Sequence, residues 1–580
     1  MTYYSDVSRS LRLWDLFLAM AFCLVLPEAF SQPQEKANDA GEIQRFDSNQ
    51  LAELETKIQK LYASVAPSVV RIFLGRQESD GGFSGVIVSR SGEVLTCAHY
   101  DLPANTKVTV ELADGTRVKG TTLGYFKKSS GGFRAHDVGM LRLDEQRNWP
   151  AVPLGRAADT KRGDLCLAVG YPMGHKPGQP PLLRLGRLLG FSPADKLRTS
   201  CRIEGGDSGG PLFDLNGRVL GVASSIPSAK WANNQYARVE DFITYRKELV
   251  AGKEFETEDK KLANARPPTD PWGAFEPAQQ LSEAVSSARR STVEIHDGNQ
   301  LLALGLIVAG DGWILTKRTE LAGHNQLLCW LADGRRVEAR VMSGSVEHDL
   351  ALLKADMTGL PVAEWADAKS LHIGQAIASI GLTPRPLNFG VIGAMHSRNP
   401  GTQGVLPIAN WESAPPPGTG VRIVALPTRG NKGDGDSSLQ LEDVITHFDG
   451  QPTPTSEDLT KLRNEREASP AGLAGERVNL TVKRGAQTFE VFVPLSHARP
   501  YFFGNVVPVS LRRNGFPNVF SHDGGATSEH CGGPVVNRSG KVIGINIARA
   551  DMVQTFAIPS DVARELVAEL KTKAGKKQAE

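Results

Sequence analysis

The stretch Glu204-Gly205-Gly206-Asp207-Ser208-Gly209-Gly210-Pro211 decides how the rest of the chain is interpreted. It places a serine after an aspartate and among glycines, which allows a tight turn and a close approach of the backbone to a ligand. In acyl transfer such a serine attacks a carbonyl, and we expect the amides of Gly206 and Ser208 to face the oxygen that becomes negative. A plain glycine-rich turn is the alternative, and the choice depends on a histidine and an aspartate upstream.

Two upstream residues complete a candidate catalytic set. His99 follows a predicted strand at 93–96, and Asp137 leads into an apolar strand at 138–143. Each residue alone is more often a surface, turn or core residue than a catalytic one. The order His99, Asp137, Ser208 along an all-β stretch is the triad order of chymotrypsin-like proteases, so the three together predict nucleophilic catalysis.

This part of the chain resembles the trypsin-like superfamily and, within it, the HtrA/DegP class of secreted quality-control proteases. The resemblance covers residues 60–250 and rests on PSVVRI (67–72), FSGVIVSRSGEVLTCAH (83–99), HDVGMLRL (136–143), GDLCLAVGYP (163–172) and GGDSGGPLFDLNGRVLGVAS (205–224). It implies a double β-barrel in which His99 is the general base and Asp137 holds its imidazole. Gly206 and Ser208 would form the oxyanion hole. Asp207 departs from the asparagine usual in HtrA proteins.

The resemblance also implies a substrate side-chain pocket, lined by residues just before the nucleophile and in the strand after it. Ile203, Ser224, Ser225 and Ile226 match an apolar, shallow pocket that suits small aliphatic side chains such as valine or alanine. Arg202 has two interpretations. It reaches the pocket floor and favours an acidic substrate side chain, or it points to solvent, which is the interpretation we favour.

The second half of the chain repeats the first. GLIVAGDGWILT (305–316) matches GVIVSRSGEVLT (85–96), HDLALLKAD (348–356) matches HDVGMLRLD (136–144), and CGGPVVNRSGKVIGINI (531–547) matches SGGPLFDLNGRVLGVAS (208–224). Repetition on this scale predicts a second β-barrel domain of the same class.

The chemistry of the second copy is predicted to be degenerate. Thr319 aligns with the position of His99. Cys531 aligns with Ser208, and only Asp349 retains its counterpart. Because a cysteine nucleophile needs an adjacent base, we predict a pseudoprotease, with a residual cysteine hydrolase as the alternative.

An insertion separates the parts of this second copy. The aspartate and the nucleophile are 71 residues apart in the first half and 182 in the second. The inserted text resembles a bacterial PDZ domain, most specifically in DVITHFDGQPTPTSEDL (443–459). PDZ domains capture peptide C-termini with backbone amides. The matching loop, Val405-Leu406-Pro407-Ile408, has proline where HtrA proteins usually have glycine, and proline has no N–H, so a spacer or regulatory role is an equal alternative.

The composition and the N-terminal sequence limit which partners, metal sites and cellular locations we expect. A formal net charge of +2 predicts no nucleic-acid partner, and no Cys or His spacing predicts a metal site or cofactor. Arg9 and Arg12, the apolar run at 16–27 and Ala29-Phe30-Ser31 resemble a secretory signal peptide, which predicts an extracytoplasmic location. The run of about 12 residues is short for a membrane span, so an uncleaved anchor is the less favoured alternative.

We therefore expect a mainly β protein with two chymotrypsin-like double β-barrel domains in tandem and a small α+β PDZ-like domain inserted in the second. The expected boundaries are 1–31 for a signal peptide, 32–50 for a disordered leader, 51–251 for the active protease domain, 252–280 for a linker, 281–400 and 499–570 for the degenerate domain, 401–498 for the insert and 571–580 for a polar tail.

The expected function is that of a secreted serine endopeptidase of HtrA type that degrades unfolded or damaged proteins, with the second domain and the insert serving binding or regulation. The alternative is a non-enzymatic chaperone or binding scaffold in which both domains are inactive. Expected partners are unfolded polypeptides and peptide C-termini at the PDZ-like domain. The resemblance to HtrA trimers also implies a homo-oligomer.

Overall fold

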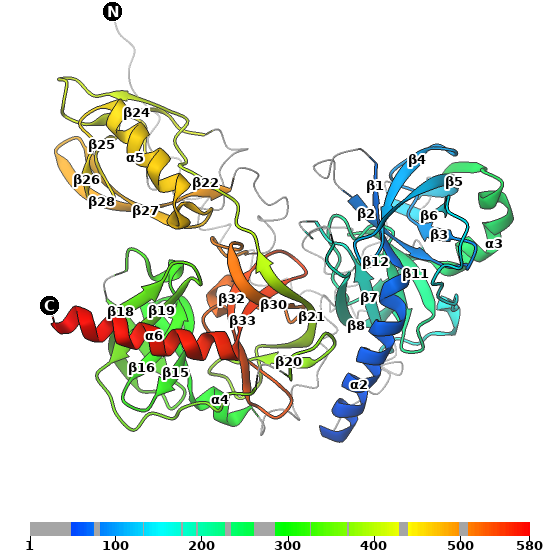
Figure 1. Ribbon diagram of the computed structural model, residues 1–580, viewed down its shortest axis with the longest axis horizontal. Helices are drawn as coiled ribbons and strands as arrows, with labels where there is room; N and C mark the ends of the chain where they lie inside the picture. Colours follow the sequence, from blue (N-terminus) through cyan, green and yellow to red (C-terminus); the bar gives the residue numbers. More distant parts are fainter. Residues whose placement is uncertain are drawn as a thin grey trace, which may run out of the picture. The chain divides into compact units, whose positions relative to one another are not determined.

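The computed structural model describes residues 48–579 except 75–81, 131–132, 174, 176–177, 193–194, 227–233, 260–284, 325, 368–369, 428–438 and 498–507. This part of the chain is mainly β and contains three closed six-stranded barrels (Figure 1). None of its helices is long and apolar enough to cross a membrane. The predicted signal peptide, 1–31, lies outside the described residues.

The first half opens with helix α2 (Ser48–Val65), whose side chains at Leu51, Leu54, Ile58 and Leu61 recur at helical spacing and are buried. A seven-stranded sheet follows in the order β13-β5-β4-β1-β2-β3-β6, and β5 also pairs with β6. Its strands are β1 (Val69–Phe73), β2 (Gly82–Ile87), β3 (Glu93–Thr96), β4 (Lys107–Glu111), β5 (Arg117–Ser130), β6 (Phe133–Leu143) and β13 (Glu254–Asp259).

A closed barrel completes the first half, in the strand order β10-β11-β12-β9-β8-β7. Helix α3 (Val239–Val250) follows it and contacts β5 and β6 of the first sheet. The barrel strands are β7 (Leu165–Gly170), β8 (Leu182–Phe191), β9 (Leu197–Thr199), β10 (Pro211–Asp214), β11 (Val219–Ser225) and β12 (Asn234–Arg238). Both sheets matter for the site, because His99 follows β3, Asp137 lies within β6 and Ser208 precedes β10.

The second half contains two more closed barrels. Short helix α4 (Ser286–Arg290) precedes the first of them, and helix α6 (Ser560–Ala579) lies against β18 and β32 (Figure 1). One barrel consists of β14 (Thr292–Asp297), β15 (Gln300–Ala309), β16 (Trp313–Lys317), β17 (Leu327–Leu331), β18 (Arg336–Ser345) and β19 (Leu350–Ala355). The other consists of β20 (Ala376–Ser379), β21 (Asn388–Asn399), β30 (Phe516–His522), β31 (Pro534–Val536), β32 (Val542–Arg549) and β33 (Thr555–Pro559).

A further sheet and helix lie in sequence between β21 and β30, two strands that pair with each other. Helix α5 (Ser456–Ala468) begins at a capping box in which the Thr455 side chain and Asp458 bond each other's backbone amides. The small pair β22 (Gly404–Val405) and β29 (Ser496–His497) flanks this unit. The main strands are β23 (Asn410–Ser413), β24 (Val421–Ala425), β25 (Val444–Phe448), β26 (Gln451–Pro452), β27 (Arg477–Arg484) and β28 (Gln487–Pro494).

The structure differs from the sequence expectations at three segment ends. Helix α2 begins at Ser48, inside the predicted leader. Strand β13 occupies Glu254–Asp259, inside the predicted linker, and pairs in parallel with β5. Helix α6 continues through the predicted polar tail to Ala579. The segment 560–574 contains no glycine or proline that would end the helix before this tail.

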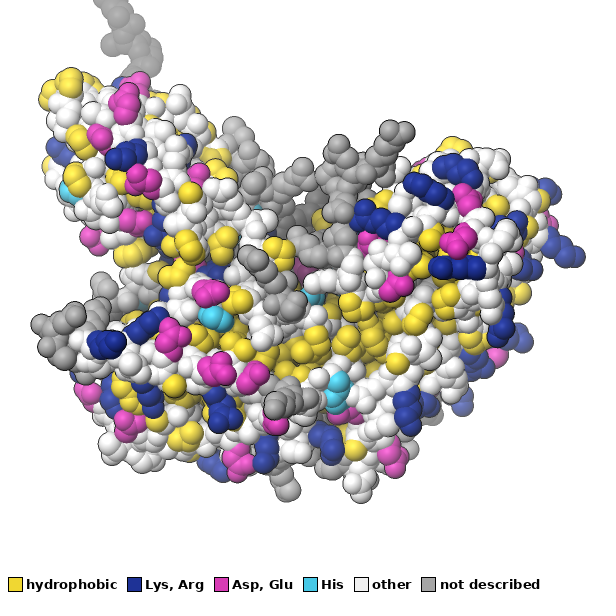
Figure 2. All heavy atoms as spheres, viewed as in Figure 1, with side chains coloured by type: hydrophobic (Ala, Val, Ile, Leu, Met, Phe, Trp, Pro, Cys, Tyr) yellow, Lys and Arg dark blue, Asp and Glu magenta, His cyan; other side chains and the backbone are white. Residues whose placement is uncertain are grey.

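Lys and Arg side chains are interspersed with Asp and Glu on the face of the molecule shown in Figure 2. This mixture agrees with the formal net charge of +2.

The short 3₁₀ turns are Ala66–Ser68, Ala157–Asp159, Thr319–Leu321, Pro470–Gly472 and Ser528–His530.

Candidate active site

The three predicted catalytic side chains lie in one hydrogen-bonded line. His99 follows β3, Asp137 lies in β6 and Ser208 precedes β10. The His99 Nδ1 atom is 2.8 Å from Asp137 Oδ2, and its Nε2 atom is 3.0 Å from Ser208 Oγ. The imidazole therefore has one nitrogen at a carboxylate and the other at a hydroxyl, which is the geometry needed to accept the serine proton.

The Asp137 carboxylate is fully buried and has several donors. Its Oδ1 atom accepts hydrogen bonds from the amides of Ala98 (2.9 Å) and His99 (3.0 Å), and its Oδ2 atom accepts one from the Ser224 hydroxyl. Burial alone would raise the pKa of Asp137, but the His99 hydrogen bond and charge, with Lys196 and Ser224, lower it to about 2. Asp137 therefore stays ionised beside the imidazole at neutral pH.

The loop around Ser208 depends on two glycines with positive φ. Gly206 has φ 91° and Gly209 has φ 82°, and β-carbons there would lie 2.5 Å from the Tyr171 carbonyl oxygen and 2.3 Å from the Ser84 carbonyl oxygen. Only glycine fits such positions. Within the described part of the chain, the amides of Gly206 and Ser208 have no hydrogen-bond acceptor, so both remain available to an anion.

Asp207, next to the nucleophile, is paired with a buried arginine. The Arg184 guanidinium bonds both carboxylate oxygens, one at 2.8 Å, and both side chains are 2% exposed or less. The same carboxylate accepts the Glu204 amide at 3.0 Å. Burial opposes the charge on Arg184, but Asp207 outweighs burial and raises the arginine pKa. An internal cation therefore fixes the loop that carries Ser208.

The aromatic ring of Tyr100 packs against the imidazole of His99. Its ring stacks on His99 with 5.0 Å between centroids and on Phe83 with 4.1 Å. Burial raises the pKa of the Tyr100 hydroxyl to about 12, so this group stays protonated next to the site. The stack restricts the rotation of His99.

The four predicted pocket residues have different environments. Ile203 is buried in the core of the closed barrel of the first half, and the Ser224 hydroxyl is directed to Asp137. The Ser225 hydroxyl is 3.4 Å from Lys196 Nζ. Ile226 is partly buried against an apolar cluster of Leu182, Ala394, Met552 and Val553. All four side chains thus make contacts within the protein.

Arg202 lies against the second half of the chain. A β-carbon on Gly525, in the second half, would lie 2.6 Å from the Arg202 guanidinium. Burial and the charge of Arg549 lower the arginine pKa to about 9, and Asp523 partly offsets them. The second half of the chain therefore partly covers this side chain, which we expected to point to solvent.

The second candidate site has the same backbone frame as the first. The Ser84 amide donates to the Ser208 carbonyl at 2.8 Å, and the Leu304 amide donates to the Cys531 carbonyl at 3.1 Å. The amide and hydroxyl of Thr319 donate to Asp349 at 2.9 and 2.8 Å. The structure therefore brings Thr319 and Asp349 together, as the repeat in the sequence predicts.

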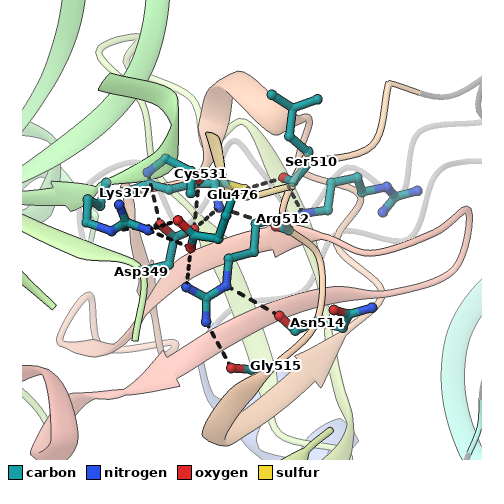
Figure 3. A network of polar contacts seen from close by, with 12 residues as sticks. Lys317, Asp349, Glu476, Ser510, Arg512, Asn514, Gly515 and Cys531 are labelled. Carbon is teal, nitrogen blue, oxygen red and sulfur yellow. Dashed lines mark hydrogen bonds and ion pairs between the residues drawn. The ribbon is translucent and has the colours of Figure 1, made fainter. Parts of the chain in front are cut away.

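Buried charges occupy this second site (Figure 3). Lys317, the counterpart of Cys97, is fully buried and bonds Asp349. Arg512 bonds Glu476 at 2.7 Å, and Arg318 bonds the same carboxylate. Burial raises the pKa of Asp349, but the cations, Lys317 first, outweigh it and lower that pKa.

Among the residues that the structure describes, no histidine bonds the Cys531 sulfur. Its sulfur is 3.6 Å from Ser510 Oγ and 3.7 Å from the Thr527 carbonyl oxygen, and burial raises its pKa to about 11. His530 Nδ1 accepts the Thr527 amide, and His324 Nδ1 is 2.7 Å from Asp297. A neutral, buried thiol is a poor nucleophile.

The predicted peptide loop lies at the edge of the inserted sheet. Leu406 and Ile408 are buried in its core, while Val405 is exposed in β22. The Ile408 amide donates to the Leu406 carbonyl at 2.8 Å and so closes a turn around Pro407. One amide of this loop is therefore used internally, and proline removes another.

The family model of the trypsin-like peptidase domain matches the chain twice, at residues 83–222 and 303–434. A probable periplasmic serine endoprotease DegP-like of Pseudomonas fluorescens is 33% identical over 156 residues, which are 26% of this chain and 30% of the relative. The chain is similar to trypsin-like serine proteases of the HtrA type. The first matched segment contains His99, Asp137 and Ser208, and the second contains Thr319 and Asp349 but ends before Cys531.

Other relatives of the HtrA-like chain agree. Serine protease HTRA4 of Mus musculus is 32% identical over 180 residues, 28% of this chain and 35% of the relative. A probable periplasmic serine protease do/HhoA-like of Haemophilus influenzae is 26% identical over 323 residues, 51% of this chain and 66% of the relative. The chain thus spans about a third of the first relatives. The crystal structure of the serine endoprotease from Yersinia pestis covers 76% of this chain and is itself 97% covered, with 12% identity and a TM-score of 0.28.

Sequence reasoning missed the buried charges of both sites. The alignment of the two halves contains a signal for Lys317, which stands where the first half has Cys97. Arg184 and Lys196 carry no such signal, because a basic residue in or beside an amphipathic strand normally faces solvent. Their partners, Asp207 and Ser224, are distant enough in sequence that only the folded barrel brings them together.

Proposed function

We propose that this chain is an extracytoplasmic serine endopeptidase of HtrA type that cleaves unfolded polypeptides at Ser208. The observation that carries the proposal is the hydrogen-bonded line from Asp137 through His99 to Ser208. The names of the periplasmic relatives support the location. The first half would be a chymotrypsin-like double barrel, and the second half its degenerate copy.

The geometry indicates how each residue contributes. As Ser208 Oγ attacks the scissile carbonyl carbon, His99 Nε2 accepts the hydroxyl proton and later gives it to the leaving amine. Asp137 holds the Nδ1 proton and stabilises the imidazolium that forms. The amides of Gly206 and Ser208 stabilise the tetrahedral oxyanion, and a water molecule activated by His99 then releases the acyl group.

The second half is proposed to be a pseudoprotease. Thr319 offers no basic nitrogen to Cys531, and the buried thiol has a raised pKa. Lys317 supplies a cation at Asp349 where the first half has an imidazole. These features favour a structural or binding role over cysteine-dependent hydrolysis.

The inserted sheet and helix are proposed to form a PDZ-like domain with a spacer or regulatory role. The internal hydrogen bond of Ile408 and the missing amide of Pro407 leave few donors for a peptide carboxylate. Capture of peptide C-termini and homo-oligomer formation are the further roles proposed from the resemblance.

A fluorophosphonate probe tests the proposed hydrolase directly. We expect the full chain to be labelled and to cleave casein, Ser208→Ala to lose both activities by at least about 10³-fold, and Cys531→Ala, the matched control, to keep both. Equal labelling of wild type and Ser208→Ala, or no labelling and no cleavage, would favour the non-enzymatic scaffold. A large loss of activity in a folded Cys531→Ala variant would contradict the pseudoprotease role.

A further inference from the structure

A buried lysine lies three hydrogen bonds away from His99. Lys196 immediately precedes β9 and its side chain is fully buried. Its Nζ atom is 2.7 Å from Ser224 Oγ, and the Ser224 hydroxyl donates to Asp137 Oδ2. Asp137 in turn bonds His99 Nδ1. The line of hydrogen bonds therefore extends beyond the three predicted catalytic residues.

We propose that Lys196 is a positioning residue for this active site, acting through Ser224 on Asp137. The inference rests on the proposed function, because it concerns how the same site is held and charged. Lys196 does not touch the reacting atoms. Its effect is exerted on the orientation of one hydroxyl group and on the charge of one carboxylate.

The first effect follows from the chemistry of the donor. An ammonium group has three N–H donors and no acceptor, so the Ser224 oxygen must accept from Lys196. A hydroxyl has a single proton, which is then directed to Asp137. Without Lys196, the Ser224 hydroxyl can rotate to other acceptors, and Asp137 loses one of the donors that fix its plane relative to the imidazole.

The second effect is electrostatic. The charge of Lys196 favours the ionised form of Asp137. In the described part of the chain, the other titratable groups around this pair are Cys97 and Tyr100 from the His99 loop and Asp207 from the nucleophile loop. Lys196 is the cation among them, so its removal should make the imidazole easier to protonate.

The degenerate copy supports this assignment independently. The Gly209 amide donates to the Ala223 carbonyl, and the Gly532 amide donates to the Asn546 carbonyl, so Ile547 occupies the place of Ser224. In that copy Lys317 bonds the aspartate directly. The intact copy instead keeps its lysine one serine away from Asp137, which leaves Oδ2 accessible to His99.

Two substitutions separate the two effects. Lys196→Met removes both the donor and the charge, whereas Lys196→Gln keeps an N–H donor for Ser224 and removes only the charge. The measurement is the rate of fluorophosphonate labelling of the full chain as a function of pH. Lys119→Met, which removes an exposed lysine from β5, is the matched control.

We expect Lys196→Met to label roughly 10-fold to 100-fold more slowly than wild type, with Lys196→Gln in between. In both variants the acid limb of the pH profile should move to higher pH by about 0.5 unit, and in Lys119→Met it should not move. Combined with Ser224→Ala, Lys196→Met should slow labelling little further, because the lysine acts through that serine.

Failure of the positioning role of Lys196 can be distinguished from failure of the proposed hydrolase function. If wild type and Ser208→Ala label equally, the proposed hydrolase fails. If wild type labels normally but both Lys196 variants keep its rate and its pH profile, the positioning role is overturned. A slower rate with an unmoved acid limb in both variants would also overturn it, since a merely structural lysine would give that result. Thermal unfolding identifies folded variants, and Lys196→Gln carries the pH test if Lys196→Met does not fold.

Discussion

Buried ion pairs beside the nucleophile decide how much a single substitution can disturb the site. Asp207 has a bidentate partner in Arg184, and both side chains are excluded from water. A buried pair adds little net stability, but removal of one partner leaves an uncompensated charge. The Arg184–Asp207 pair therefore constrains which substitutions the nucleophile loop tolerates.

Arg184→Met is expected to destabilise the protein by about 3 to 5 kcal/mol and to abolish fluorophosphonate labelling, because ionised Asp207 then has no cation in its buried site. Adding Asp207→Asn should restore much of the stability, since an asparagine oxygen can still accept the Glu204 amide. Thermal unfolding and labelling of the two variants measure both effects.

The matched control is Arg218→Met, which breaks the exposed Arg218–Asp214 pair. Exposed pairs contribute about 0 to 1 kcal/mol, so this variant should unfold and label much like wild type. A similar loss in both arginine variants would show that the position of the pair beside Ser208 has no special effect.

The residues that could be predicted from sequence are those with a local pattern. His99 follows β3, Asp137 lies in β6 and Ser208 precedes β10, and their order along the chain matches one known triad order. Lys196 and Arg184 have no local pattern, because their partners come from other strands of the barrel. Their roles depend on tertiary packing, which sequence periodicity does not contain.

At the scale of elements, the β8–β9 hairpin supplies both buried cations of the first site. Arg184 lies in β8 and Lys196 immediately precedes β9. The strand predicted at 93–96 agrees with β3, which spans Glu93–Thr96. Strand β13 was missed because a short polar segment of Glu and Asp residues has weak β propensity.

The carboxylate of Glu476 connects the inserted sheet to the second site by ion pairs. Glu476, just before β27, bonds Arg512 and Arg318, and Arg512 and Glu476 are almost fully buried. Glu476→Ala should therefore destabilise the protein by about 3 to 5 kcal/mol, since it leaves Arg512 without this partner. Calorimetric unfolding of the full chain measures the loss.

Glu490→Ala, at an exposed position in β28 of the same sheet, is the control for this prediction. It should change the free energy of unfolding by no more than about 0.5 kcal/mol. If Glu476→Ala is as mild as Glu490→Ala, the network in Figure 3 does not hold the inserted sheet in place.

At the scale of the whole molecule, polar contacts connect the two halves. Glu55 of α2 is 3.2 Å from His372 Nε2. Asp523 accepts the amides of Leu185 in β8 and Val391 in β21, each at 2.7 Å. The described residues all belong to one compact unit. The internal repeat predicts the second set of barrels, but these contacts between dissimilar segments have no counterpart in the repeat.

Buried histidines give the molecule a defined response to acid. His175, His396 and His522 are each buried, and desolvation lowers their pKa values to about 3, 4 and 4. His522 is held neutral: its Nδ1 atom accepts the Gly524 amide, and its Nε2 atom donates to Asn546 Oδ1 at 2.8 Å. Protonation would place a second donor where Gly524 already donates.

The sign of the pH dependence follows from these pKa values. An unfolded histidine, with a pKa near 6.5, binds a proton that the folded side chain rejects until about pH 4. Stability is therefore complete above about pH 6.5 and falls as the pH decreases toward 4, by up to about 1.4 kcal/mol per pH unit for each histidine. His522→Gln should reduce the slope of the free energy of unfolding against pH by the contribution of one histidine. Calorimetric unfolding between pH 7 and 4.5 measures this slope. An unchanged slope would mean that His522 is protonated in the folded protein, against the two hydrogen bonds that define its neutral form.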